Sequence, residues 1–318
     1  MPQNFNQVRH LLITPEQAGQ RVDNFLLREL KNVPKSHIYR LLRSGQVRVN
    51  GGRIKPTRKL TAGDDLRIPP VRLPDTSAPR RVPDSGRSEI QASIIHEDDD
   101  LIVLNKPAGW AVHGGTGVPY GVIEALRQAR EDMEYLELAH RLDRETSGCL
   151  MLAKNRAMLS QLHAGLRNDG QAAVHDKFYL CLVAGQWQGG ERRVDLPLSA
   201  QQLDGEERMV KVDQDGGRPA ESFFTGLERY RDCTLMQVRI TTGRMHQIRV
   251  HAQALGHPVL GDRKYGDRAL NQQMRKSGVR RMFLHAARMR LKIDRGELDF
   301  AAPLPAELET VLERLRHG

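Results

Sequence analysis

The sequence predicts an α+β protein, with a small basic unit preceding a larger domain built on a mixed, largely antiparallel sheet. Three observations support this fold class. After residue 90, strand-like apolar segments outnumber helical ones and lack the regular alternation of strand and helix that a parallel sheet requires. A stretch rich in Pro, Ser and Arg at 69–89 is typical of a linker. Residues 1–68 show the pattern of a helical hairpin followed by short strands.

The segments 21–30 and 35–45 predict the two helices of this hairpin. Apolar side chains recur at helical spacing in the first helix, at Val22, Phe25, Leu26 and Leu30. In the second helix the inward positions are Ile38, Leu41 and Leu42, and Gly45 ends it. Asn50-Gly51 then predicts a tight hairpin between two short strands, and a further strand follows within 61–68.

Positive charge is concentrated in residues 1–68. They hold 13 Lys/Arg against 5 Asp/Glu, which is +8 of the chain's net +10. Such a concentration indicates a docking element for nucleic acid, although a solvated basic surface would look the same. The candidate RNA-binding residues of this unit are Lys35, Arg40, Arg43, Arg48, Arg53 and Lys55.

The domain at 90–318 is expected to alternate strands with a few helices. The predicted strands lie within 93–107, 149–155, 177–185, 234–241 and 283–293. One predicted helix begins after Asn155, which can cap it. Two others are predicted at 246–256 and 305–316.

Composition excludes several classes of protein. Three widely spaced cysteines without a C-x-x-C pair favour a reducing cytoplasm over a disulfide framework or a zinc knuckle. Neither a signal-like start nor a run of about 20 apolar residues is present, so we expect a soluble cytoplasmic protein that does not use a membrane. The sequence offers no nucleotide-binding fingerprint and no complete metal-ligand set, because His246 and His251 have no third ligand nearby. We therefore expect neither a cofactor nor a metal.

One segment, His140-Arg141-Leu142-Asp143-Arg144-Glu145-Thr146-Ser147-Gly148, has the composition of a reactive site. It places one carboxylate, Asp143, between two arginines. A carboxylate near fixed cations stays ionised at neutral pH and can act as a nucleophile or a base. An aspartate before Thr-Ser-Gly can also simply cap a turn, so these residues alone leave a structural role open.

The same segment resembles, position for position, the H-R-L-D-x-x-T-S-G signature of the RluA family of pseudouridine synthases. Two further segments are similar to family motifs: Lys177-Phe178-Tyr179-Leu180 to K-x-Y, and residues 243–249 to G-R-x-H-Q-I-R. The opening N-K-P-x-G motif matches at residues 105–109. Met245 stands where threonine is usual and Cys181 where alanine is usual.

This resemblance implies a cofactor-independent isomerase with the pseudouridine synthase fold. It implies that Asp143 is the catalytic residue, that Arg249 pairs with it, and that Tyr179 packs against the target base. Arg141 is implied to fill the space that a flipped base leaves, or to hold a phosphate. Because neither C1′ nor C5 of uridine is accessible within a helix, the target must leave its stack.

The basic helical hairpin of residues 1–68 resembles an S4 RNA-binding domain. Together with the segments NFLLRELKNVPKSHIYRLLRSGQVRVNGGRIKP and AVHGGTGVPYGVIEALR, it implies a family subgroup that modifies several uridines of large-subunit (23S) ribosomal RNA. A monomer without an obligate protein partner is expected. Two alternatives remain open: a non-catalytic RNA-binding protein, and an N-glycosidase that would need a second carboxylate such as Glu145.

Overall fold

The structure is a computed structural model that describes residues 7–30, 33, 35–71, 81–115, 117–166, 175–201 and 209–317. The chain divides into two compact units, residues 1–80 (unit 1) and residues 81–318 (unit 2). The α+β fold class predicted from the sequence is confirmed, because helices and a mixed sheet build unit 2. Among the described residues, no helix is long and apolar enough to cross a membrane.

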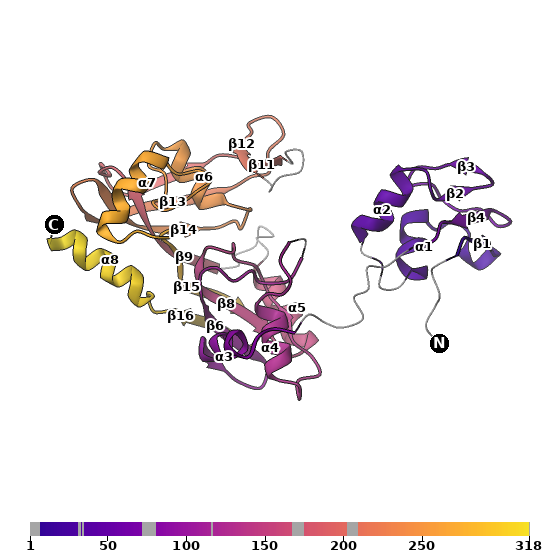
Figure 1. Cartoon of the computed structure of the whole chain (residues 1–318), viewed down its shortest axis with the longest axis horizontal. Coiled ribbons are helices and arrows are strands. Elements are labelled where there is room, and N and C mark those ends of the chain that lie inside the picture. The colour runs from indigo at the N-terminus through magenta and orange to yellow at the C-terminus, as the bar shows by residue number, and fades with distance from the viewer. Residues whose placement is uncertain are drawn as a thin grey trace. The chain divides into compact units, whose positions relative to one another are not determined.

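Unit 1 packs two helices on a four-stranded sheet (Figure 1). Its elements are β1 (Arg9–Leu12), the 3-10 helix η1 (Pro15–Gln17), α1 (Val22–Glu29), α2 (Lys35–Arg43), β2 (Arg48–Val49), β3 (Gly52–Arg53) and β4 (Asp65–Ile68). The strand order is β1-β4-β2-β3. β1, which the sequence did not predict, pairs antiparallel with β4 and completes the sheet.

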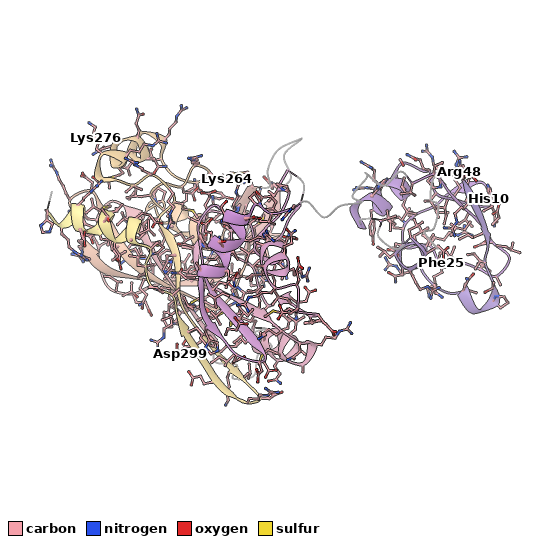
Figure 2. All side chains as sticks on the ribbon, turned by 60° about the horizontal axis from the view of Figure 1, so that its bottom comes forward. His10, Phe25, Arg48, Lys264, Lys276 and Asp299 are labelled. Carbon is pink, nitrogen blue, oxygen red and sulfur yellow. The ribbon has the colours of Figure 1, made fainter. Side chains whose placement is uncertain are left out.

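The local sequence explains the elements of unit 1. The predicted inward residues of both helices are buried in one apolar core, in which Phe25 lies inside while Arg48 lies at the surface (Figure 2). Asn50 and Gly51 adopt φ angles of 49° and 75°, the left-handed pair that a two-residue hairpin turn requires. The two helices and the hairpin predicted for this unit are therefore confirmed.

Unit 2 is built on a ten-stranded sheet (Figure 1). Its strands are β5 (Ile94–Glu97), β6 (Leu101–Lys106), β7 (Glu137–Leu138), β8 (Ser147–Ala153), β9 (His175–Ala184), β10 (Arg192–Asp195), β13 (Glu221–Arg229), β14 (Cys233–Ile240), β15 (Leu284–Ile293) and β16 (Gly296–Ala301). A separate ribbon pairs β11 (Leu198–Gln201) with β12 (Met209–Val212). The helices are α3 (Asp84–Ala92), α4 (Val122–Ala129), α5 (Arg156–Leu166), α6 (Gln247–Ala254), α7 (Arg268–Met274), the 3-10 helix η2 (Arg275–Ser277) and α8 (Ala306–His317).

The large sheet consists of two halves joined by a short seam. Its order is β10-β13-β14-β9-β15-β8-β6-β5, with β7 paired to β8 and β16 paired to β15. β15 and β8 run parallel and share only two residue pairs, His285↔Ser147 and Ala286↔Gly148. All other described strand pairs are antiparallel. The seam therefore joins a β5-β6-β8 half to a β15-β9-β14-β13-β10 half.

Gly148 makes the close approach at the seam. It has a φ of 116°, and a Cβ atom at this position would lie 2.2 Å from the carbonyl oxygen of Ala286. Only glycine combines this φ with the absence of a Cβ atom. The Ser147-Gly148 end of the predicted reactive segment is thus fixed by the packing of two strands.

The predicted linker at 69–89 differs from the structure at both ends. Val71 is buried in the core of unit 1, and residues 84–92 form helix α3 of unit 2. Val82 and Ile90 are buried in the core of unit 2 beside Trp110, and Gly86 lies against the Trp110 ring. Val82 precedes the helix, and within it Gly86 and Ile90 lie one turn apart on the buried face, which polar neighbours obscured in the sequence. Residues 72–80 of the predicted linker lie outside the described residues.

Candidate active site

Asp143 lies in the loop that connects β7 to β8, directly before the seam. The backbone N–H of Thr146 donates to the Asp143 carbonyl at 3.1 Å, so the loop turns sharply here. No described backbone amide donates to the carboxylate of Asp143, which instead contacts Arg249. The turn-capping role that the sequence left open does not describe this side chain.

The buried side chain of Lys106 holds the backbone of this loop in place. Its Nζ donates to the carbonyl oxygens of Pro107 (2.8 Å), Trp110 (2.8 Å) and Arg144 (3.2 Å). Burial lowers the pKa of Lys106 to about 7, but three acceptors match the three protons of an ammonium group, so we expect it to be charged when the loop is formed. Arg144 Nε also donates to the Gly109 carbonyl at 2.9 Å. The N-K-P-x-G segment therefore clamps the backbone next to Asp143.

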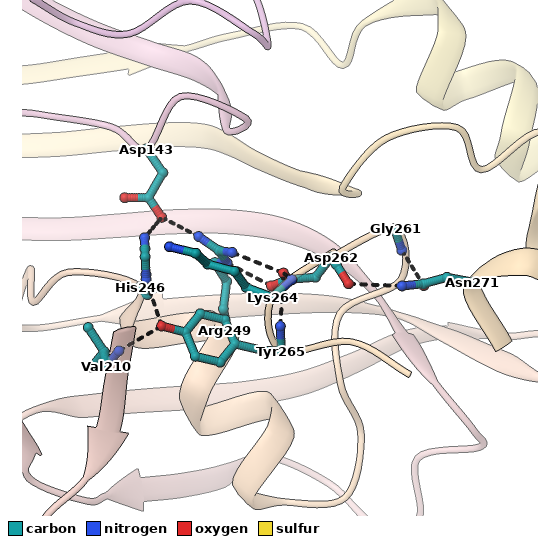
Figure 3. A network of polar contacts seen from close by, with 9 residues as sticks. All are labelled: Asp143, Val210, His246, Arg249, Gly261, Asp262, Lys264, Tyr265 and Asn271. Carbon is teal, nitrogen blue, oxygen red and sulfur yellow. Dashed lines mark hydrogen bonds and ion pairs between the residues drawn. The ribbon is translucent and has the colours of Figure 1, made fainter. Parts of the chain in front are cut away.

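Arg249 reaches Asp143 from the other half of the sheet. It belongs to α6, and its Nη1 donates to Asp143 Oδ2 at 3.2 Å. The pairing of these two residues that the family resemblance implied is present in the structure. A single hydrogen bond joins the pair, because the Arg249 fork is directed at Asp262, with Nε–Oδ2 at 2.7 Å and Nη2–Oδ1 at 2.9 Å (Figure 3).

Asp262 is the residue that fixes the Arg249 side chain. It is only 1% exposed, and its Oδ1 also accepts the backbone N–H groups of Lys264 and Tyr265. Burial alone would raise the pKa of Asp262, but hydrogen bonds and charge from Arg249 hold that pKa below its usual value. Two guanidinium nitrogens are thus held rigidly while the third points at Asp143.

His246 forms a second contact to Asp143. Its Nε2 lies 3.7 Å from Asp143 Oδ2, and its Nδ1 lies 2.8 Å from the Tyr265 hydroxyl (Figure 3). The Tyr265 oxygen accepts the Val210 N–H at 2.9 Å, so its own proton is available to His246 Nδ1. This assigns the imidazole proton to Nε2. Burial lowers the pKa of His246 to about 4, partly offset by the charge of Asp143, so the ring is neutral at pH 7.

One carboxylate oxygen of Asp143 stays available. Arg249 and His246 both approach Oδ2, whereas no described side chain binds Oδ1. The Asp143 side chain is 20% exposed and lines a cavity of about 500 Å³, here called the Asp143 cavity. This volume lies in the range of small-molecule sites. The arrangement presents one anionic oxygen to a ligand while the other is held in place.

Tyr179 lies beside the Asp143 cavity. A hollow of about 80 Å³ opens on Asp143 and is also lined by Tyr179, Ile240 and Leu284. Burial, and then the charge of Asp143, raise the pKa of Tyr179, so its hydroxyl stays protonated at neutral pH. The structure therefore brings Asp143, Arg249 and Tyr179 together around one space with both apolar and charged walls. Met245, one of the two departures from the family pattern, lines the same space, whereas Cys181 is buried in the core.

Arg141 is exposed and lines the Asp143 cavity from the same loop as Asp143. His140 points the other way. Its Nε2 accepts the Met151 N–H at 3.1 Å, and burial with a smaller effect of Lys177 lowers the pKa of His140 to about 3. The first two residues of the signature therefore differ in their surroundings: His140 is a half-buried, neutral imidazole, and Arg141 is an exposed guanidinium.

Four of the predicted RNA-binding residues of unit 1, Arg40, Arg43, Arg48 and Arg53, lie at or next to the end of α2. Arg40 and Arg43 lie in its last turn, and Arg48 Nε lies 3.3 Å from the Gly45 carbonyl. Arg48 is the cross-strand partner of Arg53 on β3 and of Arg67 on β4. Lys55 is exposed, and the side chain of Lys35 lies outside the described residues. Arg67, which the sequence analysis did not select, completes a row of three arginines on one sheet face.

The supporting residues of the site were not predicted from the sequence. Asp262 and Tyr265 lie in the segment Leu260–Gly266, LGDRKYG, where a carboxylate between a turn glycine and an aromatic residue was the available signal. Within the described ranges, no group of three or more His, Cys, Asp or Glu side chains is arranged to hold a metal ion. His246 and His251 are separately engaged, with Tyr265 and Ser222 respectively.

Comparisons with known proteins identify the class. Residues 100–254 match the profile of the family described as RNA pseudouridylate synthase, and residues 20–66 match that of the S4 domain. A solved structure of human RNA pseudouridylate synthase domain containing 4 superimposes with a TM-score of 0.59 and 26% identity, covering 73% of this chain and 97% of the human chain.

Relatives of nearly the same length are more similar. The ribosomal large subunit pseudouridine synthase C of Pasteurella multocida is 49% identical over 312 residues, which cover 97% of this chain and 94% of the relative. The Escherichia coli protein of the same name is 47% identical over 316 residues, 98% of each chain. The chain therefore belongs to the RNA pseudouridylate synthase family, as its HRLDRETSG segment predicted, and it is an isomerase with an S4 domain.

Proposed function

We propose that this protein isomerises uridine to pseudouridine at several positions of large-subunit (23S) ribosomal RNA, with Asp143 as the catalytic residue. The proposal rests on one observation, the carboxylate of Asp143: Arg249 holds Oδ2, while no side chain of the described residues binds Oδ1 beside a cavity of about 500 Å³. The choice of RNA is supported by the relatives, which are named ribosomal large subunit pseudouridine synthase C.

The reaction needs a positioned anion and an enclosure. The N1–C1′ bond breaks, the uracil turns, and a C5–C1′ bond forms with the same atoms in product and substrate. Attack at C1′, addition to the base and removal of a sugar proton each require an ionised carboxylate that faces the substrate. Arg249 and the neutral His246 would keep Asp143 oriented, while the cavity retains the detached base between the two bond changes.

Tyr179 and Arg141 would act on the flipped nucleotide and on its surroundings. Extrusion of a base costs a few kcal/mol, and stacking on an aromatic ring returns about 1–3 kcal/mol per base. Tyr179 is suited to this role because it lines the hollow next to Asp143. Arg141 is suited to fill the vacated stack or to bind a phosphate because it is exposed on the rim of the same cavity.

Unit 1 would provide sequence-independent affinity for RNA. Arg53, Arg48 and Arg67 occupy directly opposed positions on β3, β2 and β4, an arrangement that is destabilising unless an anion is bound. Arg40, Arg43 and Lys55 extend the charge, and Lys35 is the predicted addition. Removal of residues 1–68 is expected to weaken RNA binding and to reduce the dependence of affinity on salt.

The decisive experiment maps pseudouridines in ribosomal RNA. Cells that lack the protein should lose defined 23S sites, which the wild-type gene restores and Asp143→Asn does not. The purified Asp143→Asn protein should still bind RNA, because only the charge of one side chain changes. Turnover by Asp143→Asn within tenfold of wild type would contradict the assignment.

Two further expectations are part of this proposal. Ribosomal RNA as substrate supports action in the cytoplasm, and we propose that the protein acts there as a monomer. The N-glycosidase alternative predicts free uracil after incubation with RNA. Pseudouridine formation without release of uracil would exclude it.

A further inference from the structure

Unit 2 concentrates its positive charge in one segment. Residues 263–281 hold 7 Lys/Arg against 1 Asp/Glu, a net charge of +6. Residues 69–318 as a whole carry only +2, so the rest of that region has a net charge of −4. The net charge of the whole region does not reveal this basic segment, because acidic residues elsewhere cancel most of it.

The segment is a fixed platform rather than a loose loop. It contains α7 and η2, and it is anchored in the core through Met274 and Val279. The Asn271 side chain accepts the Gly261 N–H at 2.7 Å and donates to the Asp262 carbonyl at 2.8 Å (Figure 3). α7 is therefore tied directly to the residue that holds Arg249.

Three arginines of this segment lie without an acidic partner among the described residues, whereas Arg281 pairs with Glu307. Within the described part of the chain, no ion pair engages Arg263, Arg268 or Arg275, and all three are exposed. Arg288 and Arg290, in contrast, share Asp299 on the opposite side of unit 2 from Lys264 and Lys276 (Figure 2). Unpaired cations gathered on one rigid surface repel one another, which an anionic ligand would relieve.

A groove connects these cations to the site. It has a volume of about 590 Å³ and is lined by Arg263, Arg268, Arg275, Asn271 and Gln272; we call it the basic groove. Asp262 and Arg263 line both the basic groove and the Asp143 cavity, so the two are adjacent. A chain that enters one can continue along the other.

We propose that the basic groove binds the phosphate backbone of the RNA strand that flanks the uridine in the Asp143 cavity. This rests on the proposed function. Guanidinium groups bind phosphate oxygens in pairs, and spaced arginines suit a polyanion better than a single small anion. The groove would hold the neighbouring nucleotides while the target base is flipped, and it would contribute affinity without contacting the reacting atoms.

The test compares two triple variants of the full chain. Arg268→Gln/Arg275→Gln/Lys276→Gln removes three charges at or beside the groove, and Arg288→Gln/Arg290→Gln/Arg295→Gln removes three on the β15–β16 face. Affinity for a 23S transcript that contains a mapped site is measured across a salt series. Each lost phosphate contact reduces the slope of log affinity against log salt by about 0.7–0.9. We expect the groove variant to lose at least tenfold in affinity and about 2 units of slope, and the control to match wild type.

A second readout separates binding from chemistry. The single-turnover rate with saturating enzyme should be unchanged in the groove variant, because none of its three residues contacts Asp143 or Arg249. Wild-type slope and affinity in the groove variant, or equal losses in the control, would overturn the proposal. A preference for an acidic protein over the transcript would also overturn it.

The outcome does not depend on the success of the proposed function. If the wild-type protein bound the transcript but formed no pseudouridine, the function would fail while the salt series still judged the groove. Thermal melts verify that the variants fold. If the triple variant is unstable, the single substitutions Arg268→Gln and Arg275→Gln replace it, each with an expected slope loss of about 0.7–0.9.

Discussion

Arg249 holds Asp143 through a single hydrogen bond, Nη1 to Oδ2 at 3.2 Å, because its other two nitrogens are bound by Asp262. The carboxylate is therefore oriented by a residue that is itself immobilised. A flexible cation at the same distance would supply the charge but not the position.

Arg249→Lys tests this distinction. Lysine keeps the charge but cannot bind Asp262 in two places and reach Asp143 as well. We expect kcat to fall by on the order of 100-fold, the effect of a misplacement of about 1 Å, with little change in KM for RNA. Steady-state kinetics on a 23S transcript measures both. Wild-type kcat in this variant would mean that charge alone suffices.

Asp262→Asn should have a similar effect on kcat, because it removes one of the two hydrogen bonds that Asp262 accepts from Arg249. It also leaves a buried guanidinium poorly paired, which costs about 3–5 kcal/mol of stability. Asp267→Asn is the matched control, since Asp267 is exposed and asparagine can still cap α7. Combining Asp262→Asn with Arg249→Lys should cost little more than the worse single change, because both act on one contact. Additive losses would argue against a shared role.

Tyr179→Phe and Tyr179→Leu separate the ring from the hydroxyl. Burial raises the pKa of Tyr179, so the hydroxyl is protonated at neutral pH and is a poor base. Phenylalanine should therefore keep most of the activity. Leucine should lose the stacking contribution of about 1–3 kcal/mol, or about 5- to 150-fold in kcat/KM. The reverse order of the two variants would assign the function to the hydroxyl.

Unit 2 should lose stability in mild acid. Burial lowers the pKa of His140 to about 3, against 6.5 for an unperturbed histidine. Between these two values, the imidazole binds a proton in the unfolded chain but stays neutral in the folded chain. This contribution is complete above pH 6.5 and is lost as the pH falls from 6.5 toward 3. At pH 5 it amounts to about 2 kcal/mol.

Urea unfolding at pH 7 and pH 5 measures this loss. Both tryptophans of the chain, Trp110 and Trp187, lie in unit 2, so their fluorescence reports on that unit. His140→Gln keeps an acceptor for the Met151 N–H but does not titrate. Its loss between the two pH values should be smaller by about the same 2 kcal/mol. An identical pH dependence in the two proteins would show that His140 is not responsible.

Gly148→Ala should disrupt the seam. The new Cβ atom would lie 2.2 Å from the Ala286 carbonyl oxygen, on a residue that already has a left-handed φ. Gly296→Ala is the control: its φ is 128°, but its Cβ would have no atom within 4 Å, so it imposes backbone strain alone. We expect Gly296→Ala to cost about 1–3 kcal/mol and Gly148→Ala to cost more and to abolish turnover. Equal unfolding midpoints in urea would contradict the steric argument.

Much of this architecture could be predicted from the sequence. Val22, Phe25 and Leu26 identified α1 by their spacing, and Asn50-Gly51 identified the hairpin, because both are local signals. Asp143 was identified by a nine-residue signature. Helix α3 was missed because Ile90 is its one buried apolar residue, among polar neighbours.

The supporting parts of the site could not be predicted, for physical reasons. The Arg249–Asp262 fork joins residues 13 positions apart through a turn, and its geometry depends on how α6 packs against residues 260–266. Similarly, the charge of residues 263–281 was cancelled in the total for the domain. Only the fold shows that this segment lies beside Asp143.

The seam between β8 and β15 has a consequence for biosynthesis. Asp143 precedes β8 in one half of the sheet, whereas Tyr179 lies on β9 in the other half and Arg249 lies on α6. β15 joins the two halves and is made almost last, at Leu284–Ile293. A ribosome that has translated four-fifths of the message has made Asp143, Tyr179 and Arg249 but not the strand that joins the two halves of the sheet. Products truncated before β15 are therefore expected to be inactive, so that premature termination yields no partially competent modifier of RNA.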